Sequence, residues 1–123
     1  ALAEDLGRAG DVTAAACIPA DARLRAVFAS RASGVLAGAD CLRLAVLAMD
    51  PHARSELRLR DGEALSPGAV IAEVESDARA LLAAERTALN LLGRLCGVAT
   101  LTRAYVDAVA GTGARIADTR KTT

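Results

Sequence analysis

Aromatic side chains are scarce in this chain, and their scarcity limits the kind of core that it can build. Only 2% of the 123 residues are aromatic, whereas 53% are hydrophobic, mostly alanine, leucine and valine. Aromatic residues bury the largest area per side chain. We therefore expect a core of closely packed small aliphatic side chains, and a chain of this length has enough of them for one core.

A net charge is also lacking, because the 15 cationic residues balance the 15 anionic ones. No basic run is present, so the sequence argues against a nucleic-acid surface. The cations are nearly all arginine, and Lys121 is the only lysine. The planar fork of arginine suits carboxylates and phosphates, although codon usage alone produces the same bias.

Cysteine and histidine are too few and too scattered for the sites that they usually build. Three cysteines stand far apart without a C-x-x-C pair, at Cys17, Cys41 and Cys96. This pattern excludes a disulfide framework or a zinc site and favours a reducing compartment. The single histidine, His52, follows Asp50-Pro51 in a turn, where a surface position is expected.

Long apolar runs and a signal-peptide pattern are missing as well. We therefore expect a cytoplasmic protein without a membrane segment.

Four short segments have the composition of strands, and one segment between them has the spacing of a helix. The expected strands are Leu24–Arg31, Gly34–Gly38, Ser55–Arg60 and Ala69–Glu75. The expected helix starts at Ala39 and ends at Asp50-Pro51. Ser55–Arg60 alternates between leucine and charge, so one sheet face should be solvated. The layout predicted is an α+β open-faced sandwich, with antiparallel strands and helices on one face.

The start of the chain combines turn residues with acidic side chains, in Glu4–Gly7 and Gly10–Thr13. Aspartates in such segments cap turns or hold the arginine of a partner. The turn is the simpler interpretation.

From Ala78 the sequence predicts a long helix, a glycine break, a second helix and a glycine stop near Gly111. The leucines of the first helix share one half of its circumference: Leu81, Leu82, Leu89, Leu91, Leu92 and Leu95. The opposite half carries Arg86, Asn90 and Arg94, with Gly93 and Gly97 near the same face. On spacing alone, a solvated helix face is the simpler interpretation of these arginines.

One carboxylate, Glu85, falls inside the leucine arc of this helix. A buried carboxylate is costly unless it is paired, so we expect an arginine partner for it.

The end of the chain combines a strand-like segment with cations. Ala114–Asp118 is a candidate strand, followed by Thr119-Arg120-Lys121. In α/β barrels, ligands are held at the carboxyl ends of strands. We therefore expect an N-terminal domain over residues 1–113, and the first strand of an otherwise absent α/β barrel over residues 114–123.

Several motifs together resemble the quinolinate phosphoribosyltransferase (nicotinate-nucleotide pyrophosphorylase, carboxylating) family. The matching stretches are Glu4–Gly7, Gly10–Thr13, Gly34–Gly38, Asp61-Gly62, Pro67-Gly68, Glu85–Asn90, Gly97–Thr100 and Asp118–Thr122. Each is weak alone, but their order and spacing span almost the whole chain. The resemblance implies an N-terminal sandwich followed by an incomplete barrel, in a homodimer whose active sites lie between the two subunits.

The resemblance also implies an activity. The family is a pentosyltransferase (glycosyltransferase) of NAD biosynthesis, which converts quinolinate and phosphoribosyl pyrophosphate to nicotinate mononucleotide, pyrophosphate and CO₂, with Mg²⁺ bound to the phosphoribosyl pyrophosphate. Carried over, the substrate-binding residues are Arg86, Thr119, Arg120 and Lys121. Arg86 would reach the neighbouring subunit's site. No catalytic residue or metal ligand is assigned within this chain.

The chain also departs from the family pattern. The helix that precedes Ala1 in the family is absent, as is nearly all of the barrel, so the chain alone is not expected to be active. Cys96 stands where serine is common in the family.

Two other classes of function also fit the sequence. One is a paralogue of the same fold, either the molybdate-transport-associated protein or nicotinate phosphoribosyltransferase. The other is a non-catalytic dimerisation or anion-binding module. The run Glu85–Asn90, taken with Thr119-Arg120-Lys121, favours the quinolinate enzyme.

Overall fold

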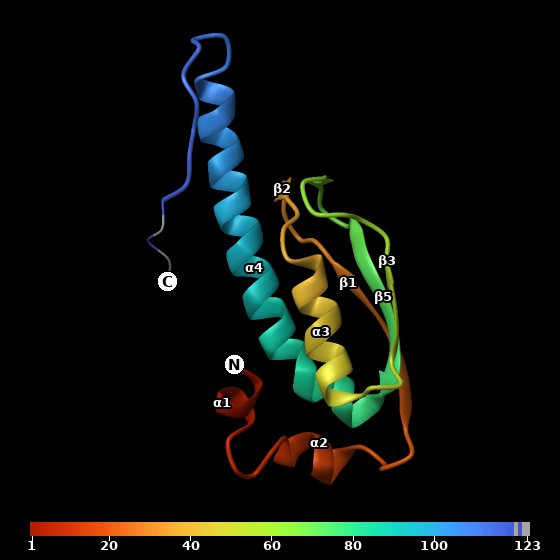
Figure 1. Ribbon diagram of the computed structural model, residues 1–123. Helices are drawn as coiled ribbons and strands as arrows, with labels where there is room; N and C mark the ends of the chain where they lie inside the picture. Colours follow the sequence, from red (N-terminus) through yellow and green to blue (C-terminus); the bar gives the residue numbers. More distant parts are fainter. Residues whose placement is uncertain (120, 122–123) are drawn as a thin grey trace.

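A computed structural model describes residues 1–119 and 121, and it shows a sheet covered on one face by two helices (Figure 1). The helices are α1 (Leu2–Leu6), α2 (Val12–Cys17), α3 (Ala39–Met49) and α4 (Ala78–Ala108). The strands are β1 (Arg23–Ala29), β2 (Gly34–Val35), β3 (Arg54–Leu57), β4 (Ala64–Leu65) and β5 (Val70–Asp77). No helix within the described residues has the length and hydropathy needed to span a membrane.

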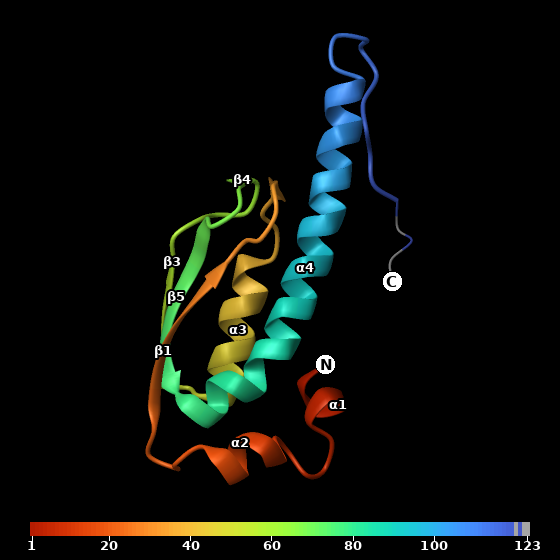
Figure 2. The same ribbon diagram turned by 180° about the vertical axis from the view of Figure 1, so that it is seen from behind.

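The main sheet has the order β1-β5-β3, and both pairings are antiparallel. Alternate side chains of each strand point to opposite faces. The inward set includes Phe28, Ala72 and Val74, each at most 5% exposed. Helices α3 and α4 cover this inner face, and the other face stays open (Figures 1 and 2). The expected open-faced α+β sandwich is confirmed.

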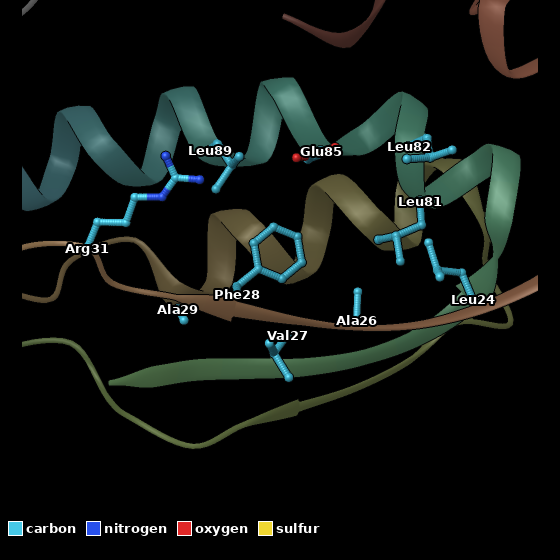
Figure 3. Close-up of a pocket in the computed structure, with 10 residues that line it drawn as sticks. All are labelled: Leu24, Ala26, Val27, Phe28, Ala29, Arg31, Leu81, Leu82, Glu85 and Leu89. Carbon is cyan, nitrogen blue, oxygen red and sulfur yellow. The ribbon is translucent and has the colours of Figure 1, made fainter. Parts of the chain in front are cut away.

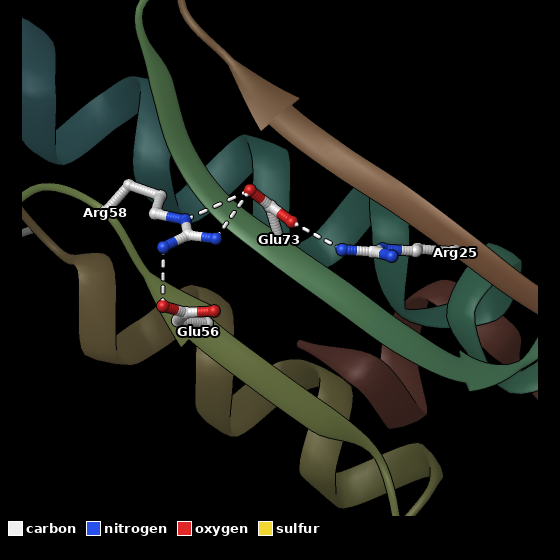
Figure 4. A network of polar contacts seen from close by, with 4 residues as sticks. All are labelled: Arg25, Glu56, Arg58 and Glu73. Carbon is white, nitrogen blue, oxygen red and sulfur yellow. Dashed lines mark hydrogen bonds and ion pairs between the residues drawn. The ribbon is translucent and has the colours of Figure 1, made fainter.

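The open face of the sheet carries a network of ion pairs (Figure 4). Arg25 of β1 and Arg58, just after β3, both donate to the Glu73 carboxylate of β5, each at 3.0 Å. Arg58 also pairs with Glu56. The hydrogen bonds from Arg25 and Arg58 lower the pKa of Glu73, against the opposing effect of burial. This face is therefore solvated and polar, as the alternation in Ser55–Arg60 predicts.

The core is aliphatic, as the composition predicts. Phe28 is the one aromatic residue among the buried side chains that the structure describes. The largest side chains with almost no exposure are Leu36, Leu42, Val46, Val74 and Ser76. They come from the sheet, from α3 and from the segment that follows β2.

Asp50 ends α3 and ties it to the sheet. Its buried carboxylate accepts hydrogen bonds from Ser76 Oγ at 2.8 Å and from the backbone N–H groups of Asp77 and His52, both at 2.9 Å. The Asp77 and Ser76 bonds, with smaller effects of His52 and the Arg23 charge, lower the pKa of Asp50 to about 2 against the opposing effect of burial. His52 itself is exposed, as expected.

A second joint connects the β2 region to α4. Thr100 Oγ1 accepts from the Val35 N–H at 2.9 Å, and Cys96 Sγ accepts from the Ala37 N–H at 3.3 Å. A Cβ at Gly34 would lie 2.7 Å from Thr100 Oγ1, so the close approach requires glycine there. Cys96 thus makes a polar contact with the backbone just after β2.

The glycine break expected in the C-terminal helix is wrong, because α4 runs without interruption from Ala78 to Ala108. Gly93 and Gly97 lie inside it, where each costs about 1 kcal/mol relative to alanine. The contacts of Cys96 and Thr100 with the β2 region hold this stretch helical. Leu92 is the last buried residue of α4. Beyond it the helix extends past the sheet (Figures 1 and 2).

Three other expectations also need correction. The N-terminal segments form short helices, α1 and α2, rather than turns alone, because Asp11 caps α2. In Gly34–Gly38 only two residues form a strand, which pairs with the unforeseen β4. Ala114–Asp118 is not in a strand, since a strand needs a neighbour to share its hydrogen bonds and none lies beside it in the described chain.

Candidate functional site

The rotation of α4 sets the direction in which Arg86 points. The helix begins after Asp77, whose side chain accepts a hydrogen bond from the Ala80 N–H at 2.8 Å. Leu81, Ala84 and Ala88 face the core, each at most 3% exposed. Arg86 lies on the other side of the helix, and 73% of its side chain is exposed. The solvated face that the spacing predicts for this arginine is confirmed.

Helix α2 is held against the start of α4 by Arg79. Its Nε donates to the Ile18 carbonyl at 2.8 Å, and its Nη2 donates to the Ala15 carbonyl at 3.1 Å. Both carbonyls lie at the C-terminal end of α2, where the last carbonyls of a helix have no partner inside it. At the other end of α2, Asp11 accepts from the Ala14 N–H at 2.8 Å. Arg79 thus ties the C-terminal end of α2 to the start of α4, and Asp11 caps its N-terminal end.

Asp5 of α1 contacts Arg86 directly. Arg86 Nη1 donates to Asp5 Oδ1 at 3.1 Å, and 22% of the Asp5 side chain is exposed. Both residues line a shallow pocket of about 200 Å³ between α1, the start of α2 and α4. The two aspartates of the N-terminal segments therefore have different roles, because Asp11 caps a helix and Asp5 holds an arginine of its own chain. The sequence could not reveal this pair, which is 81 positions apart.

The other expected site residues lie in the C-terminal tail. Thr119 and Lys121 are exposed, and the Lys121 N–H donates to Thr119 Oγ1 at 3.4 Å. Arg120 lies outside the described residues. No hydrogen bond or ion pair joins Arg86 to the part of the tail that is described. The structure therefore does not bring Arg86 together with Thr119 and Lys121 within one chain.

The arginine partner expected for Glu85 is not found among residues 1–119, and this expectation is wrong for the described chain. Glu85 is exposed, so water can solvate its carboxylate. It lines a cleft of about 520 Å³ between β1 and α4 (Figure 3). Arg31 extends into the same cleft, whose other walls are mainly aliphatic. None of the expected site residues that the structure describes lines this cleft, whereas Arg86 lines the smaller pocket.

The described residues contain no group of three or more His, Cys, Asp or Glu side chains that could hold a metal ion. The chemistry available here is therefore that of an exposed guanidinium. Arginine has five N–H donors in a planar fork, and one bond to Asp5 leaves an edge of the fork for another anion. Such an edge matches a carboxylate or a phosphate in two parallel hydrogen bonds.

Comparison with known proteins gives consistent matches over nearly the whole chain. The family model described as "Quinolinate phosphoribosyl transferase, N-terminal domain" matches residues 11–96. A nicotinate-nucleotide pyrophosphorylase [carboxylating] of Mycobacterium leprae is 44% identical over 99% of this chain and 44% of its own length. A quinolinate phosphoribosyltransferase [decarboxylating] of Nicotiana tabacum is 38% identical over 99% of this chain and 34% of its own.

Solved structures agree with these sequence matches. A crystal structure of NadC from Streptococcus pyogenes superposes with a TM-score of 0.93 at 31% identity. The match covers 99% of this chain and 43% of that one. The chain thus spans well under half the length of these relatives.

Proposed function

This chain belongs to the quinolinate phosphoribosyl transferase family through its N-terminal domain, and from that membership we propose that it is the N-terminal part of a carboxylating nicotinate-nucleotide pyrophosphorylase. The proposed reaction joins quinolinate to phosphoribosyl pyrophosphate and yields nicotinate mononucleotide, pyrophosphate and CO₂. The observation that carries the proposal is the match to the Mycobacterium leprae enzyme over 99% of the chain. The protein would act in NAD biosynthesis, and its cytoplasmic location stays a prediction.

The domain boundary follows from the same proposal. Residues 1–113 form the sandwich domain with its long helix, and residues 114–123 begin a C-terminal α/β barrel. The described residues 114–119 are exposed and outside any strand, which supports a segment whose strand partners belong to that barrel. Complete sites would form only in a homodimer, between the barrel of one subunit and the N-terminal domain of the other.

The charges of the substrates explain the residues assigned to them. Quinolinate has two adjacent carboxylates on a pyridine ring, and both substrates are anionic. Arg86 and Arg120 offer forked donors that match carboxylates, and Lys121 offers a compact charge for a carboxylate or phosphate oxygen. The Thr119 hydroxyl adds a neutral donor. This chain supplies binding groups rather than a general acid or base.

The bonds formed and broken are consistent with such a site. The lone pair of the pyridine nitrogen attacks C1 of the ribose, while the bond from C1 to pyrophosphate breaks. The nitrogen is itself the nucleophile, so this step needs no general base. The ring carboxylate beside the new bond then leaves as CO₂, its bonding electrons stay on the ring carbon next to the cationic nitrogen, and a proton from solvent replaces it. Mg²⁺ is expected to accompany the pyrophosphate group, and we assign it no ligand in this chain.

An assay of the full-length protein tests the proposal and separates it from its alternatives. With quinolinate and phosphoribosyl pyrophosphate, we expect nicotinate mononucleotide and CO₂ in equal amounts, measured by chromatography and by trapped label from the ring carboxylate. Turnover with nicotinate and no release of CO₂ would instead identify the nicotinate enzyme. A protein that turns over neither substrate would contradict the proposal and favour a binding module.

A further inference from the structure

We propose that Asp5 is a positioning residue for Arg86, which it orients so that the free edge of the guanidinium faces a substrate carboxylate. This inference rests on the proposed function and adds a role for α1, a helix of five residues. The role is not visible in the composition of the segment, which has the character of a turn. The contact between Asp5 Oδ1 and Arg86 Nη1, at 3.1 Å, is its starting point.

The two members of this pair differ in freedom. The Arg86 side chain is 73% exposed and the Asp5 side chain only 22%. An exposed arginine has about 2 kcal/mol of rotamer entropy to lose when it is fixed. The Asp5 carboxylate has a short side chain on a helix that packs against α4, so it is the fixed partner. Asp5 therefore restrains Arg86 before a ligand arrives, which lowers the entropy that binding must remove.

The geometry leaves Arg86 free to bind. The contact uses Nη1 alone, so Nε and Nη2 remain available for a forked interaction with a second anion. Arg79 separately holds the C-terminal end of the neighbouring helix α2. Asp11 caps α2 in the same pocket and is already occupied by the Ala14 N–H. Asp5 is thus the carboxylate in that pocket that acts on Arg86.

Electrostatic repulsion alone predicts the opposite effect of removing the Asp5 carboxylate on quinolinate binding. A carboxylate beside the site repels a doubly negative ligand, so removing it should strengthen binding if Asp5 only competes with quinolinate for Arg86. Orientation and competition therefore change the KM for quinolinate in opposite directions. The direction of the change decides between them.

The experiment uses the full-length protein and compares Asp5→Asn with Glu4→Gln. Glu4 is an exposed carboxylate on the same helix with no hydrogen bond among the described residues, so its variant removes the same charge without the contact. We expect Asp5→Asn to raise the KM for quinolinate roughly 2- to 5-fold, the scale of a surface ion pair. The KM for phosphoribosyl pyrophosphate should stay constant, and Asp5→Glu should recover part of the loss. Glu4→Gln should leave both constants unchanged.

A double variant tests whether Asp5 acts through Arg86. In an Arg86→Ala background, Asp5→Asn should cause no further rise in the KM for quinolinate. A lower KM in Asp5→Asn, an equal rise in both KM values, or a full additional effect in the double variant would overturn the inference. A wild-type protein without activity on quinolinate would instead remove the proposed function. Thermal unfolding of each variant shows whether a change in KM comes from misfolding.

Discussion

The free energy that Arg86 contributes depends on which anion it binds. As a partner of Asp5 alone, Arg86 contributes little, because exposed ion pairs are worth about 0–1 kcal/mol. In its proposed role as a forked donor to a substrate carboxylate, it would contribute more, because a hydrogen bond to a charged group is worth roughly 1.5–3 kcal/mol. Stability and binding therefore report different roles of the same side chain.

Arg86→Ala should weaken quinolinate binding roughly 10- to 150-fold, the equivalent of one lost charge-assisted pair. The melting temperature should barely change, because 73% of the side chain is exposed. Arg86→Lys keeps the charge without the fork, so its affinity for quinolinate should fall between those of the wild type and Arg86→Ala. Calorimetric titration of the full-length protein measures the affinity. An unchanged affinity in Arg86→Ala would remove this residue from the site.

Asp50 shows how a carboxylate can act on stability alone. Its pKa is lowered to about 2 from an ordinary 3.8, chiefly by the Asp77 N–H, the Ser76 hydroxyl and the His52 N–H. A lowered pKa in the folded state means that the ionised group stabilises the fold above pH 4. This contribution is lost as the pH falls from about 4 towards 2, where the carboxylate takes up a proton.

Asp50→Asn should therefore lower the stability at pH 7 and make it fall less steeply between pH 4 and pH 2. Urea unfolding at a series of pH values measures both effects. Asp40→Asn is the matched control, because Asp40 pairs with Arg43 at an exposed position, and it should keep the wild-type slope. Equal slopes for the wild type and Asp50→Asn would show that the three hydrogen bonds do not set this acid sensitivity.

At the scale of elements, α3 depends on a residue from outside itself. The carboxylate of Asp61 accepts from the Gly38 N–H at 2.8 Å and from the Ala39 N–H at 3.0 Å. Gly38, at φ +90°, has no side chain to cap the helix. The turn after β3 therefore supplies the cap that most helices obtain from the preceding residue.

Asp61→Ala should destabilise the domain by about 1–2 kcal/mol, the upper range for a lost cap. Asp61→Asn keeps one acceptor oxygen and should cost about half as much. Denaturant unfolding measures the difference. Asp21→Ala, at an exposed position without a hydrogen bond in the described chain, provides the control. A loss in Asp61→Ala no larger than in Asp21→Ala would show that water replaces the cap at no cost.

The elements that the sequence predicts well are those long enough to show a clear composition or period. Strand-like composition located β1 and β5, alternation located β3, and helical spacing located α3 with the correct start at Ala39. The pair β2–β4 has two residues per strand, too few for any period. Helices α1 and α2 are also short, with five and six residues, and a distant arginine, Arg79, holds α2 in place. The continuity of α4 through Gly97 also depends on tertiary contacts, which local composition does not contain.

At the scale of the whole molecule, the site was predictable only in part for the same reason. Helical spacing placed Arg86 on a solvated face, and the structure agrees. The pairing of Arg86 with Asp5 needed the folded chain, because it joins residues 81 positions apart. The tail residues Thr119 and Lys121 are not brought to Arg86 within this chain. Whether these residues meet in a site shared between two subunits stays a prediction.

Mixing subunits tests this arrangement directly. In the proposed dimer, one site takes Arg86 from one chain and Arg120 from the other, so a dimer of Arg86→Ala with Arg120→Ala has one site with both defects and one intact site. Random pairing of the two weakened variants makes about half of the dimers mixed. At quinolinate concentrations well below the raised KM of each variant, co-refolding equal amounts should then restore about a quarter of the wild-type activity per subunit. Each variant refolded alone should stay far below this level under the same conditions, and a mixture without recovery would place both arginines in the same chain's site.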